Sequence, residues 1–285
     1  MKAPAIAYHA AQSLADALGI LAAPPGDVRL VAGGQSMVAA LNLRLAAPDL
    51  LLDIGRLEEL RGIRRTGTAL HIGALTRHAD IARDAQVQAA LPMLPAICRH
   101  IAHPAIRNRG TLGGSLALAD PAAEWPAAML ALQARFLLRS QAAERWVMAA
   151  DFFQDVYETA LRPDEILCAI EVPLPAENTR WAFDEFARRH GDFALAGMLL
   201  LAQVRDGRIA ALNFGCLGLG RVPEAAPQTA AALQGLTLAE AADKVAALLA
   251  AELAPLADRH ASAEYRRHLA GLLGQRLLRR IANEG

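Results

Sequence analysis

The sequence predicts an α+β fold of two domains, and three observations support this. The chain has 285 residues, of which 54% are apolar, and this is enough material for two buried cores. Before Pro173, short apolar runs alternate with glycine turns and helical patterns. After Pro175, three long apolar runs and the dipeptide Asp206-Gly207 predict an antiparallel sheet, followed by two helices rich in alanine and leucine. We therefore expect a domain boundary near these two prolines.

Turn and cap residues set the order of elements in the first domain. Pro48 closes one helical pattern, Thr66-Gly67-Thr68 separates the two strands of a hairpin, and Thr76 is placed to cap a short helix. Asp120-Pro121 has the pattern of an N-cap followed by proline at the first helical position. The expected strands are 28–31, 50–54, 61–65, 69–72, 135–139, 145–149 and 165–172, and helical patterns cover 37–45 and 91–102.

The second domain has a simpler pattern of three strands and two helices. Strands are expected over 181–188, 193–204 and 209–217, and helices over about 238–253 and 262–283. The last helix carries an apolar stripe at helical spacing, which is either ordinary core or a contact with another subunit. The residues of this stripe are Leu269, Leu272, Leu273, Leu277 and Ile281.

Composition excludes several classes of protein. Lys plus Arg and Asp plus Glu number 29 each, so no net charge draws the chain to nucleic acid or to an anionic membrane. Apolar runs such as 193–204 are shorter than the roughly 20 residues of a membrane-spanning helix. Because His9, Gln12 and Asp16 interrupt the apolar N-terminus, we expect no secretory signal and a cytoplasmic location.

The sequence offers no pattern for a metal site. Cys98, Cys168 and Cys216 are far apart and form no CxxC pair, so we expect them to be core residues. His100 and His103 can share a helix face, but no carboxylate or third histidine stands near them in the sequence. We therefore expect no metal ligand in this chain.

Two glycine segments are the strongest sign of a ligand. AGGQS at 32–36 and TLGGS at 111–115 each place adjacent glycines beside an apolar run. Glycine tolerates positive φ, and successive backbone N–H groups can form a nest for an anion. Either segment alone is an ordinary tight turn on the simplest interpretation, but two together can hold both phosphates of a diphosphate. Neither matches the P-loop of nucleoside triphosphatases or the Rossmann glycine fingerprint.

The order of the motifs resembles one known family. AGGQS, LLDIGRLEELRGI, IGALTRHADI, AIRNRGTLGGSLALADPAAEWPAAMLAL and RRHGDFALAG follow one another as in the FAD-binding medium subunit of the molybdenum hydroxylases, the carbon monoxide dehydrogenase and xanthine dehydrogenase group. The resemblance implies an FAD-binding domain of the vanillyl-alcohol-oxidase or p-cresol-methylhydroxylase type over 1–176, with subdomains of about 1–55 and 56–176. A C-terminal domain of the carbon monoxide dehydrogenase flavoprotein type, with an antiparallel sheet and helices, is then expected over 177–285.

The same resemblance implies a set of residues for FAD and none for catalysis. Those expected at the diphosphate are Ala32, Gly33, Gly34, Gln35, Ser36, Thr111, Gly113, Gly114 and Ser115. Ile101 and Glu124 match positions near the flavin and ribityl parts of the cofactor, and Asp192 in RRHGD matches a segment that faces the flavin. The other interpretation of RRHGD is a solvated charged turn. Relatives commonly carry His at position 35, Asp or Asn at 115 and Asp at 124, which affects side-chain contacts but not the backbone nest.

The resemblance also implies partners. Substrate would be hydroxylated at a molybdenum cofactor on a large subunit, electrons would cross [2Fe–2S] clusters on a small subunit, and FAD in this chain would pass them to an external acceptor. A dimer of such heterotrimers is expected. The alternatives are a self-contained FAD-dependent oxidase or reductase of the same fold and a scaffold that binds no cofactor. The substrate, whether carbon monoxide, an aldehyde, a purine or another N-heterocycle, is not encoded in this chain.

Overall fold

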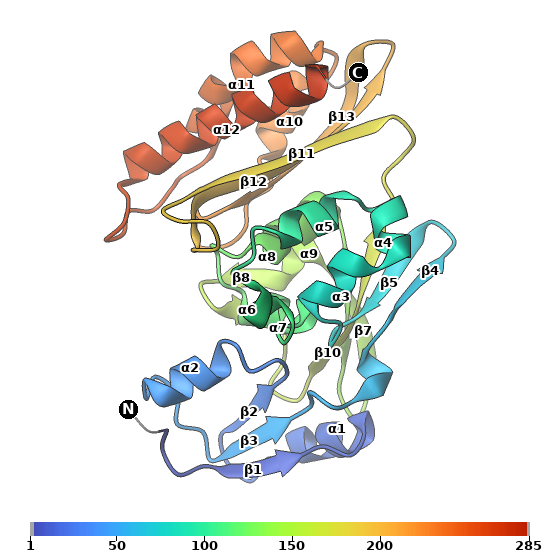
Figure 1. The fold of residues 1–285 in the computed structure, drawn as a ribbon, viewed down its shortest axis with the longest axis vertical. Helices are drawn as coiled ribbons and strands as arrows, with labels where there is room; N and C mark the ends of the chain where they lie inside the picture. The colour runs from blue at the N-terminus through green and yellow to red at the C-terminus, as the bar shows by residue number, and fades with distance from the viewer. Residues whose placement is uncertain (1–2, 284–285) are drawn as a thin grey trace.

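The computed structural model describes residues 3–283, and its elements lie in three layers that follow the order of the chain (Figure 1). A small sheet formed by the N-terminal segment lies at one end. A larger sheet with its helices occupies the middle, and the C-terminal sheet with its helices lies at the other end. Strands and helices are mixed throughout, so the predicted α+β class is confirmed. The exact bounds of the domains, 1–176 and 177–285, stay a prediction.

The N-terminal sheet is parallel, with strand order β1-β3-β2. Its strands are β1 (Ala7–Ala10), β2 (Val28–Val31) and β3 (Leu50–Asp53), joined by helices α1 (Leu14–Ala22) and α2 (Met37–Asn42). Such crossovers are what parallel pairing requires. The sequence pattern did not lead us to expect β1 or α1. Helix α2 ends before the expected position 45, because Arg44 adopts a left-handed φ of 58°.

The middle layer is a five-stranded sheet with order β4-β5-β10-β6-β7, antiparallel at every pairing. Its strands are β4 (Ile63–Thr66), β5 (Ala69–Gly73), β6 (Arg135–Arg139), β7 (Glu144–Met148) and β10 (Ile166–Pro173). The expected hairpin around Gly67 is confirmed by the pairing of β4 with β5. A short two-stranded sheet is formed by β8 (Phe153–Asp155) and β9 (Glu158–Thr159).

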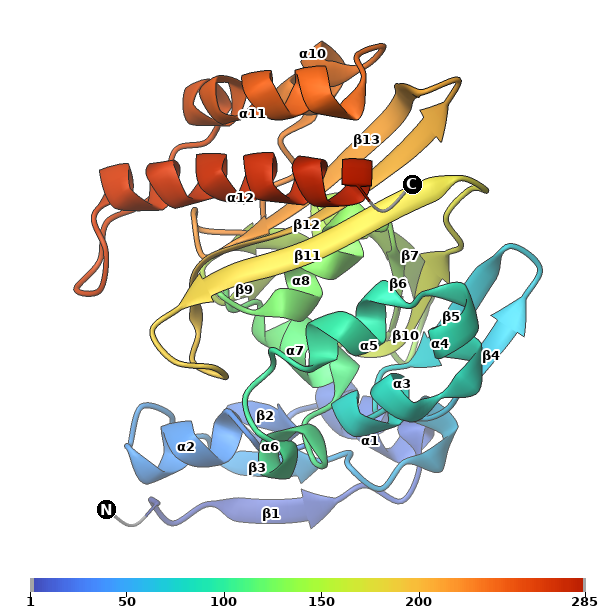
Figure 2. The same ribbon diagram turned by 45° about the horizontal axis from the view of Figure 1, so that its top comes forward.

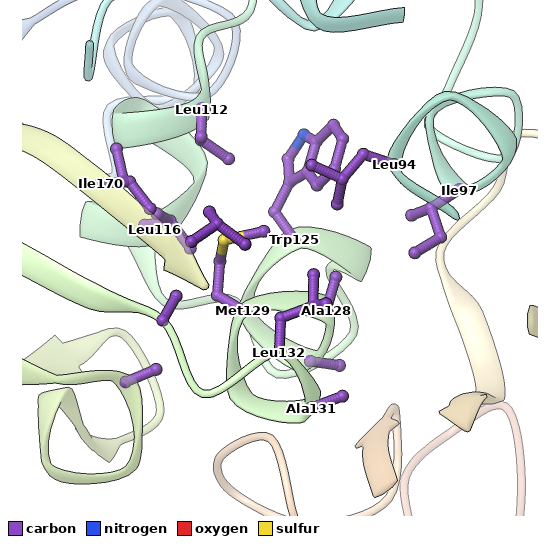
Figure 3. Close-up of a cluster of buried hydrophobic side chains, with 14 of the residues drawn as sticks. Leu94, Ile97, Leu112, Leu116, Trp125, Ala128, Met129, Ala131, Leu132 and Ile170 are labelled. Carbon is purple, nitrogen blue, oxygen red and sulfur yellow. The ribbon is translucent and has the colours of Figure 1, made fainter. Parts of the chain in front are cut away.

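Helices pack on the middle sheet around the largest core. They are α3 (His78–Arg83), α4 (Ala85–Ala90), α5 (Met93–Cys98), α7 (Leu112–Leu118), α8 (Glu124–Ala131) and α9 (Ala149–Phe152). The 3₁₀ turn η1 (Glu58–Leu60) contributes Leu60 to the core of the N-terminal sheet, and the short helix α6 (Pro104–Arg107) buries no residue. Figure 3 shows how Trp125 from α8 extends between side chains of α7 and α5, next to Leu112 and Leu94. Trp125 is only 1% exposed, so α8 is fixed within this core.

Two predicted helix starts were wrong. Thr76 does not cap α3, because its Oγ1 donates instead to the carbonyl oxygen of Gly62 at 3.2 Å. Asp120 does not begin α8: its Oδ1 accepts from the N–H of Ala122 at 2.9 Å, which closes a local turn, and the helix begins at Glu124. In both cases the cap pattern was real but the oxygen found another partner nearby.

The C-terminal layer confirms the predicted antiparallel sheet, β11 (Thr179–Ala187), β12 (Ala194–Arg205) and β13 (Arg208–Leu217) in that order. Asp206 and Gly207 have φ of 49° and 74°, which suits a type I′ hairpin. Helices α10 (Pro227–Leu233), α11 (Leu238–Glu252) and α12 (Ala263–Asn283) follow, and Figure 2 shows the long helices α11 and α12 beside this sheet. The sequence pattern did not predict α10.

The C-terminal sheet packs against the middle layer through α8. A Cβ on Gly215 of β13 would collide with the carbonyl oxygen of Ala127 in α8, so backbone meets backbone at this point. On the other side, Leu269, Leu273, Leu277 and Ile281 of α12 are buried in the C-terminal core, which confirms the core interpretation for these four residues of the stripe. The fifth, Leu272, is 38% exposed and is not a core residue. Within residues 3–283, no helix combines the length and the apolar character needed to cross a membrane.

Candidate functional site

The two glycine segments, far apart in the sequence, lie against each other. A Cβ on Gly33 would collide with the carbonyl oxygen of Arg109, just before the second segment. A Cβ on Gly114 would lie 3.8 Å from the Cβ of Ala32. The sequence predicted that the two segments together hold a diphosphate, and the tertiary structure places them against each other at the carboxyl end of β2.

The first segment presents free backbone donors. Gly34 has a φ of 74°, which lets the chain turn sharply between β2 and α2. In the part of the chain that the structure describes, the backbone N–H groups of residues 33–36 have no acceptor. Gln35 instead uses its side-chain Nε2 to donate to the carbonyl oxygen of Gly33 at 2.9 Å, which holds the turn. Successive free N–H groups at a turn are the donor set that binds an anion such as a phosphate.

The second segment is the first turn of helix α7 and not the tight turn that the sequence suggested. Thr111 is its N-cap, and its Oγ1 accepts from the N–H of Gly114 at 3.2 Å. Neither Gly113 nor Gly114 has positive φ. Gly113 is needed for close packing, because a Cβ at this position would collide with Ala74. Gly114 is exposed, and its bare backbone faces the first segment.

A second group of predicted residues lies where the first domain meets the loop between β11 and β12. Gly191 has a φ of 85°, and a Cβ there would lie 2.8 Å from the carbonyl oxygen of Ala102. The guanidinium of Arg107 holds the same stretch, because its Nη1 donates to the carbonyl oxygens of Ile101 and Ala102, each at 2.8 Å. The side chain of Ile101 itself is buried in the large core.

The loop that carries RRHGD presents two exposed side chains. Asp192 is exposed, and its neighbour Phe193 is 66% exposed, an unusual position for a large aromatic ring. Phe193 was expected as the first residue of a strand, but β12 begins at Ala194. Its exposure was therefore missed, and no signal in the sequence alone separates an exposed from a buried first residue of an apolar run.

Glu124 is an acidic residue inside this interface. It is only 8% exposed at the start of α8, and burial, followed by the charge of Glu185, raises its pKa to about 8. Glu185 in turn pairs with His100, with 3.2 Å between Oε1 and Nδ1. No pattern along the chain predicts a carboxylate beside His100, because Glu185 comes from the other domain.

The three cysteines lie in three different cores, and their predicted role as core residues is confirmed. Cys98 belongs to the large middle core, Cys168 to the core of the N-terminal sheet and Cys216 to the C-terminal core. Burial raises the pKa of the Cys98 thiol to about 11 and that of Cys168 to about 12, and it raises the pKa of Cys216 as well. Among residues 3–283, no three His, Cys, Asp or Glu side chains are arranged to hold a metal ion.

Comparisons with known proteins cover almost the whole chain. Residues 4–175 match the FAD binding domain in molybdopterin dehydrogenase, and residues 181–281 match the CO dehydrogenase flavoprotein C-terminal domain. The chain is 38% identical to the nicotine 6-hydroxylase medium subunit of Paenarthrobacter nicotinovorans, over 100% of this chain and 99% of that protein. It is 36% identical to the carbon monoxide dehydrogenase medium chain of Hydrogenophaga pseudoflava, over 96% of each.

Solved structures give the same result. Carbon monoxide dehydrogenase from Hydrogenophaga pseudoflava superposes with a TM-score of 0.95 at 35% identity, covering 99% of this chain and 98% of that one. Quinoline 2-oxidoreductase from Pseudomonas putida 86 also superposes with a TM-score of 0.95, at 37% identity over 100% and 99% of the two chains. Sequence and fold therefore agree over both domains.

Proposed function

The chain belongs to the FAD-binding medium subunits of the molybdenum hydroxylases, and we propose that it carries electrons, through its FAD, from an iron–sulfur subunit to an external acceptor. It is an oxidoreductase subunit whose cofactor is FAD. When bound, FAD supplies electron-transfer chemistry that no side chain can provide. The work of the polypeptide is to hold that cofactor, orient it and give electrons a way in and out.

The residues at the two glycine segments fit a diphosphate. The unpaired N–H groups of residues 33–36 provide donors for one phosphate, and the exposed backbone at Gly114 lies against the same turn. Ala32, Thr111, Gly113 and Ser115 support this arrangement as neighbours of these donors. Because main-chain donors need no particular side chain, Gln35 and Ser115 fit the role although relatives commonly carry other residues there.

We place the flavin end of the cofactor between the domains. The exposed ring of Phe193 offers a flat apolar surface, and planar rings pack well on aromatic side chains. Asp192 beside it can accept a hydrogen bond. On the first domain we assign Glu124 and the backbone at Ile101 to this site, as the family resemblance implies, because Gly191 of the same loop lies against the carbonyl oxygen of Ala102. Arg107 and Gly191 would keep the two sides at a fixed distance.

The electron route follows from where the cysteines lie. An all-cysteine [2Fe–2S] cluster needs four thiolates. This chain has three cysteines, buried in three separate cores, so it cannot build one. Electrons must therefore come from another polypeptide. We propose a small subunit that carries the iron–sulfur clusters and a large subunit that carries the molybdenum cofactor and the substrate, assembled as a dimer of heterotrimers.

The test separates this relay from a self-contained flavoenzyme. The full chain is loaded with FAD, reduced chemically, and mixed with oxygen, NAD⁺, a quinone or a dye while flavin absorbance is followed. In parallel, the oxidised chain is offered an N-heterocycle, carbon monoxide and an aldehyde, with and without the iron–sulfur and molybdenum subunits. We expect reoxidation by at least one acceptor, and flavin reduction by substrate only when both partners are present. Flavin reduction by a substrate with the chain alone would overturn the proposal.

A further inference from the structure

Two titratable side chains from different parts of the chain pair at the domain interface, and their charges act on a third, that of Glu124. Glu124 begins α8, His100 follows α5, and Glu185 lies on β11 of the C-terminal sheet. His100 Nδ1 lies 3.2 Å from Glu185 Oε1, and the side chain of Glu185 is only 4% exposed. His100 also packs edge-on against Phe183, with 5.0 Å between ring centroids, which fixes its orientation.

The group contains more negative charge than its partners neutralise. Glu185 uses Oε1 for His100, but its Oε2 is buried and has no hydrogen-bond partner among the described residues. In the same part of the structure, the carboxyl of Glu124 has no side-chain partner, and only the N–H of its own backbone approaches it. Two buried carboxylates that share one cation are costly, and such pairs commonly keep a proton.

We propose that Glu124, His100 and Glu185 form a proton-holding site between the two domains, with Glu124 as a neutral acid and Glu185 as the carboxylate that pairs with a protonated His100. This inference rests on the proposed function, because the role of the site is to hold an acidic O–H beside the proposed position of the flavin. With FAD bound, Glu124 would serve as a proton donor as the cofactor gains electrons, and its O–H bond would break. Glu124 is then a carboxylate and must regain a proton from solvent.

A route to solvent lies beside His100. The ring of His190, in the exposed loop after β11, lies 6.0 Å from that of His100 between centroids. His100 is itself 29% exposed, so water can reach its free nitrogen while Nδ1 faces Glu185. Protons can therefore enter at His190 or His100 and reach the carboxyl pair without crossing the large core.

The carboxylates around the site raise the pKa of both Glu124 and His100. Burial, the charge of Glu185 and then Asp120 raise the pKa of Glu124 to about 8, and only its own backbone N–H and His100 oppose this. The hydrogen bond to Glu185 raises the pKa of His100, with smaller contributions from the charges of Glu185, Asp184 and Glu124, although burial opposes them. The neighbouring carboxylates therefore favour the protonated forms of both Glu124 and His100.

The full chain without FAD allows a direct test by infrared spectroscopy. We expect a carboxylic-acid C=O band at pH 7 that shifts in D₂O, disappears with a midpoint near pH 8, and is missing in Glu124→Gln. In Glu185→Gln the band should disappear at a lower pH, because the repelling charge is gone. The matched control is Glu171→Gln, which removes the partner of another histidine, His71, paired at 3.0 Å in the first domain, and should leave the band unchanged.

A second measurement does not depend on Glu124. The NMR titration of His100 should show a pKa above the ordinary value in the wild type, and Glu185→Gln should lower that pKa. No acid band in the wild type at pH 7, a band that survives in Glu124→Gln, or an unshifted His100 would each overturn the proton site. FAD binding is measured on the same samples, so a chain that shows the band but binds no FAD would overturn the proposed function and leave the proton site standing.

Discussion

Trp125 Nε1 donates a 2.9 Å hydrogen bond to Nδ1 of His78, and His78 packs against the backbone that leads into the second glycine segment. Both residues are buried, at 1% and 5% exposure. The backbone N–H of His78 donates to the carbonyl oxygen of Gly110 at 3.0 Å, and a Cβ on Gly110 would lie 2.7 Å from His78 Nε2. The neutral imidazole of His78 thus fixes the backbone just before Thr111.

The first prediction concerns stability at acidic pH. Burial, helped by the charge of Arg107, lowers the pKa of His78 to about 4 from 6.5. Because the pKa of His78 is lower in the folded than in the unfolded state, the contribution of the neutral imidazole to the free energy of unfolding is complete above pH 6.5. It is lost as the pH falls toward 4, by on the order of 3 kcal/mol. Urea unfolding of the full chain between pH 4 and 7 should show this loss. In His78→Gln the free energy of unfolding should change less steeply with pH than in the wild type.

The matched control for this prediction is His103→Gln, which changes an exposed histidine of the same region. The free energy of unfolding of this variant should depend on pH in the same way as that of the wild type. Equal slopes for the wild type and His78→Gln would show that His78 does not titrate within this window.

The second prediction concerns Glu124 at alkaline pH. Because its folded pKa is raised to about 8, the stabilisation from its neutral form is complete below pH 4.5 and is lost as the pH rises through 8. Without FAD, Glu124→Gln should therefore be more stable than the wild type at pH 9, and the difference should shrink toward pH 5. Thermal unfolding at the two pH values measures it. A constant difference across the range would contradict the assigned titration.

The third prediction separates cofactor binding from backbone strain. Gly34 and Gly207 have the same φ of 74°, but Gly34 lies in the proposed phosphate nest and Gly207 lies in a hairpin with open space around it. Valine at either position should cost about 1–3 kcal/mol of stability through strain. Only Gly34→Val should weaken FAD binding, by tenfold or more, in a titration of the apo chain. Equal FAD affinity in the two variants would remove the first segment from the cofactor site.

The fourth prediction concerns the exposed ring of Phe193. If the flavin packs on it, Phe193→Ala should lose about 0.5–1.5 kcal/mol of stacking in addition to buried area, which corresponds to an FAD dissociation constant raised by about tenfold. Stability of the apo chain should change little, because the ring is 66% exposed. Tyr265→Ala, which removes a ring that is 48% exposed on α12, is the control and should leave FAD binding intact. An unchanged dissociation constant for Phe193→Ala would argue against this placement.

The fifth prediction concerns Arg107, which holds the carbonyl oxygens of Ile101 and Ala102. Arg107→Met leaves two partly buried acceptors without a donor and should destabilise the chain by about 1–3 kcal/mol. FAD binding should weaken as well, because Ala102 is the point where Gly191 meets the first domain. Arg99→Met changes an exposed arginine nearby and should affect neither quantity. The free energy of unfolding is measured by urea unfolding and the FAD dissociation constant by titration, on the same preparations.

Local chemistry predicted a large part of the fold. The Asp206-Gly207 hairpin, the strands on both sides of it and the core stripe of α12 depend on turn geometry and on hydrophobic periodicity, which act over a few residues. The short range of these effects also explains why two helix starts were predicted wrongly. Thr76 and Asp120 both carry capping oxygens, but each had a competing partner nearby that the pattern could not rank.

The sequence by itself determined the class of fold, the family and the two glycine segments on which the cofactor proposal depends. Only the tertiary structure decided that these segments touch, that Phe193 remains exposed, and that Glu185 faces His100 and Glu124. Each of these depends on segments far apart in the chain that meet only in the folded protein. Such packing depends on the shape and the volume of the whole core, and a pattern read along a single chain does not contain that information.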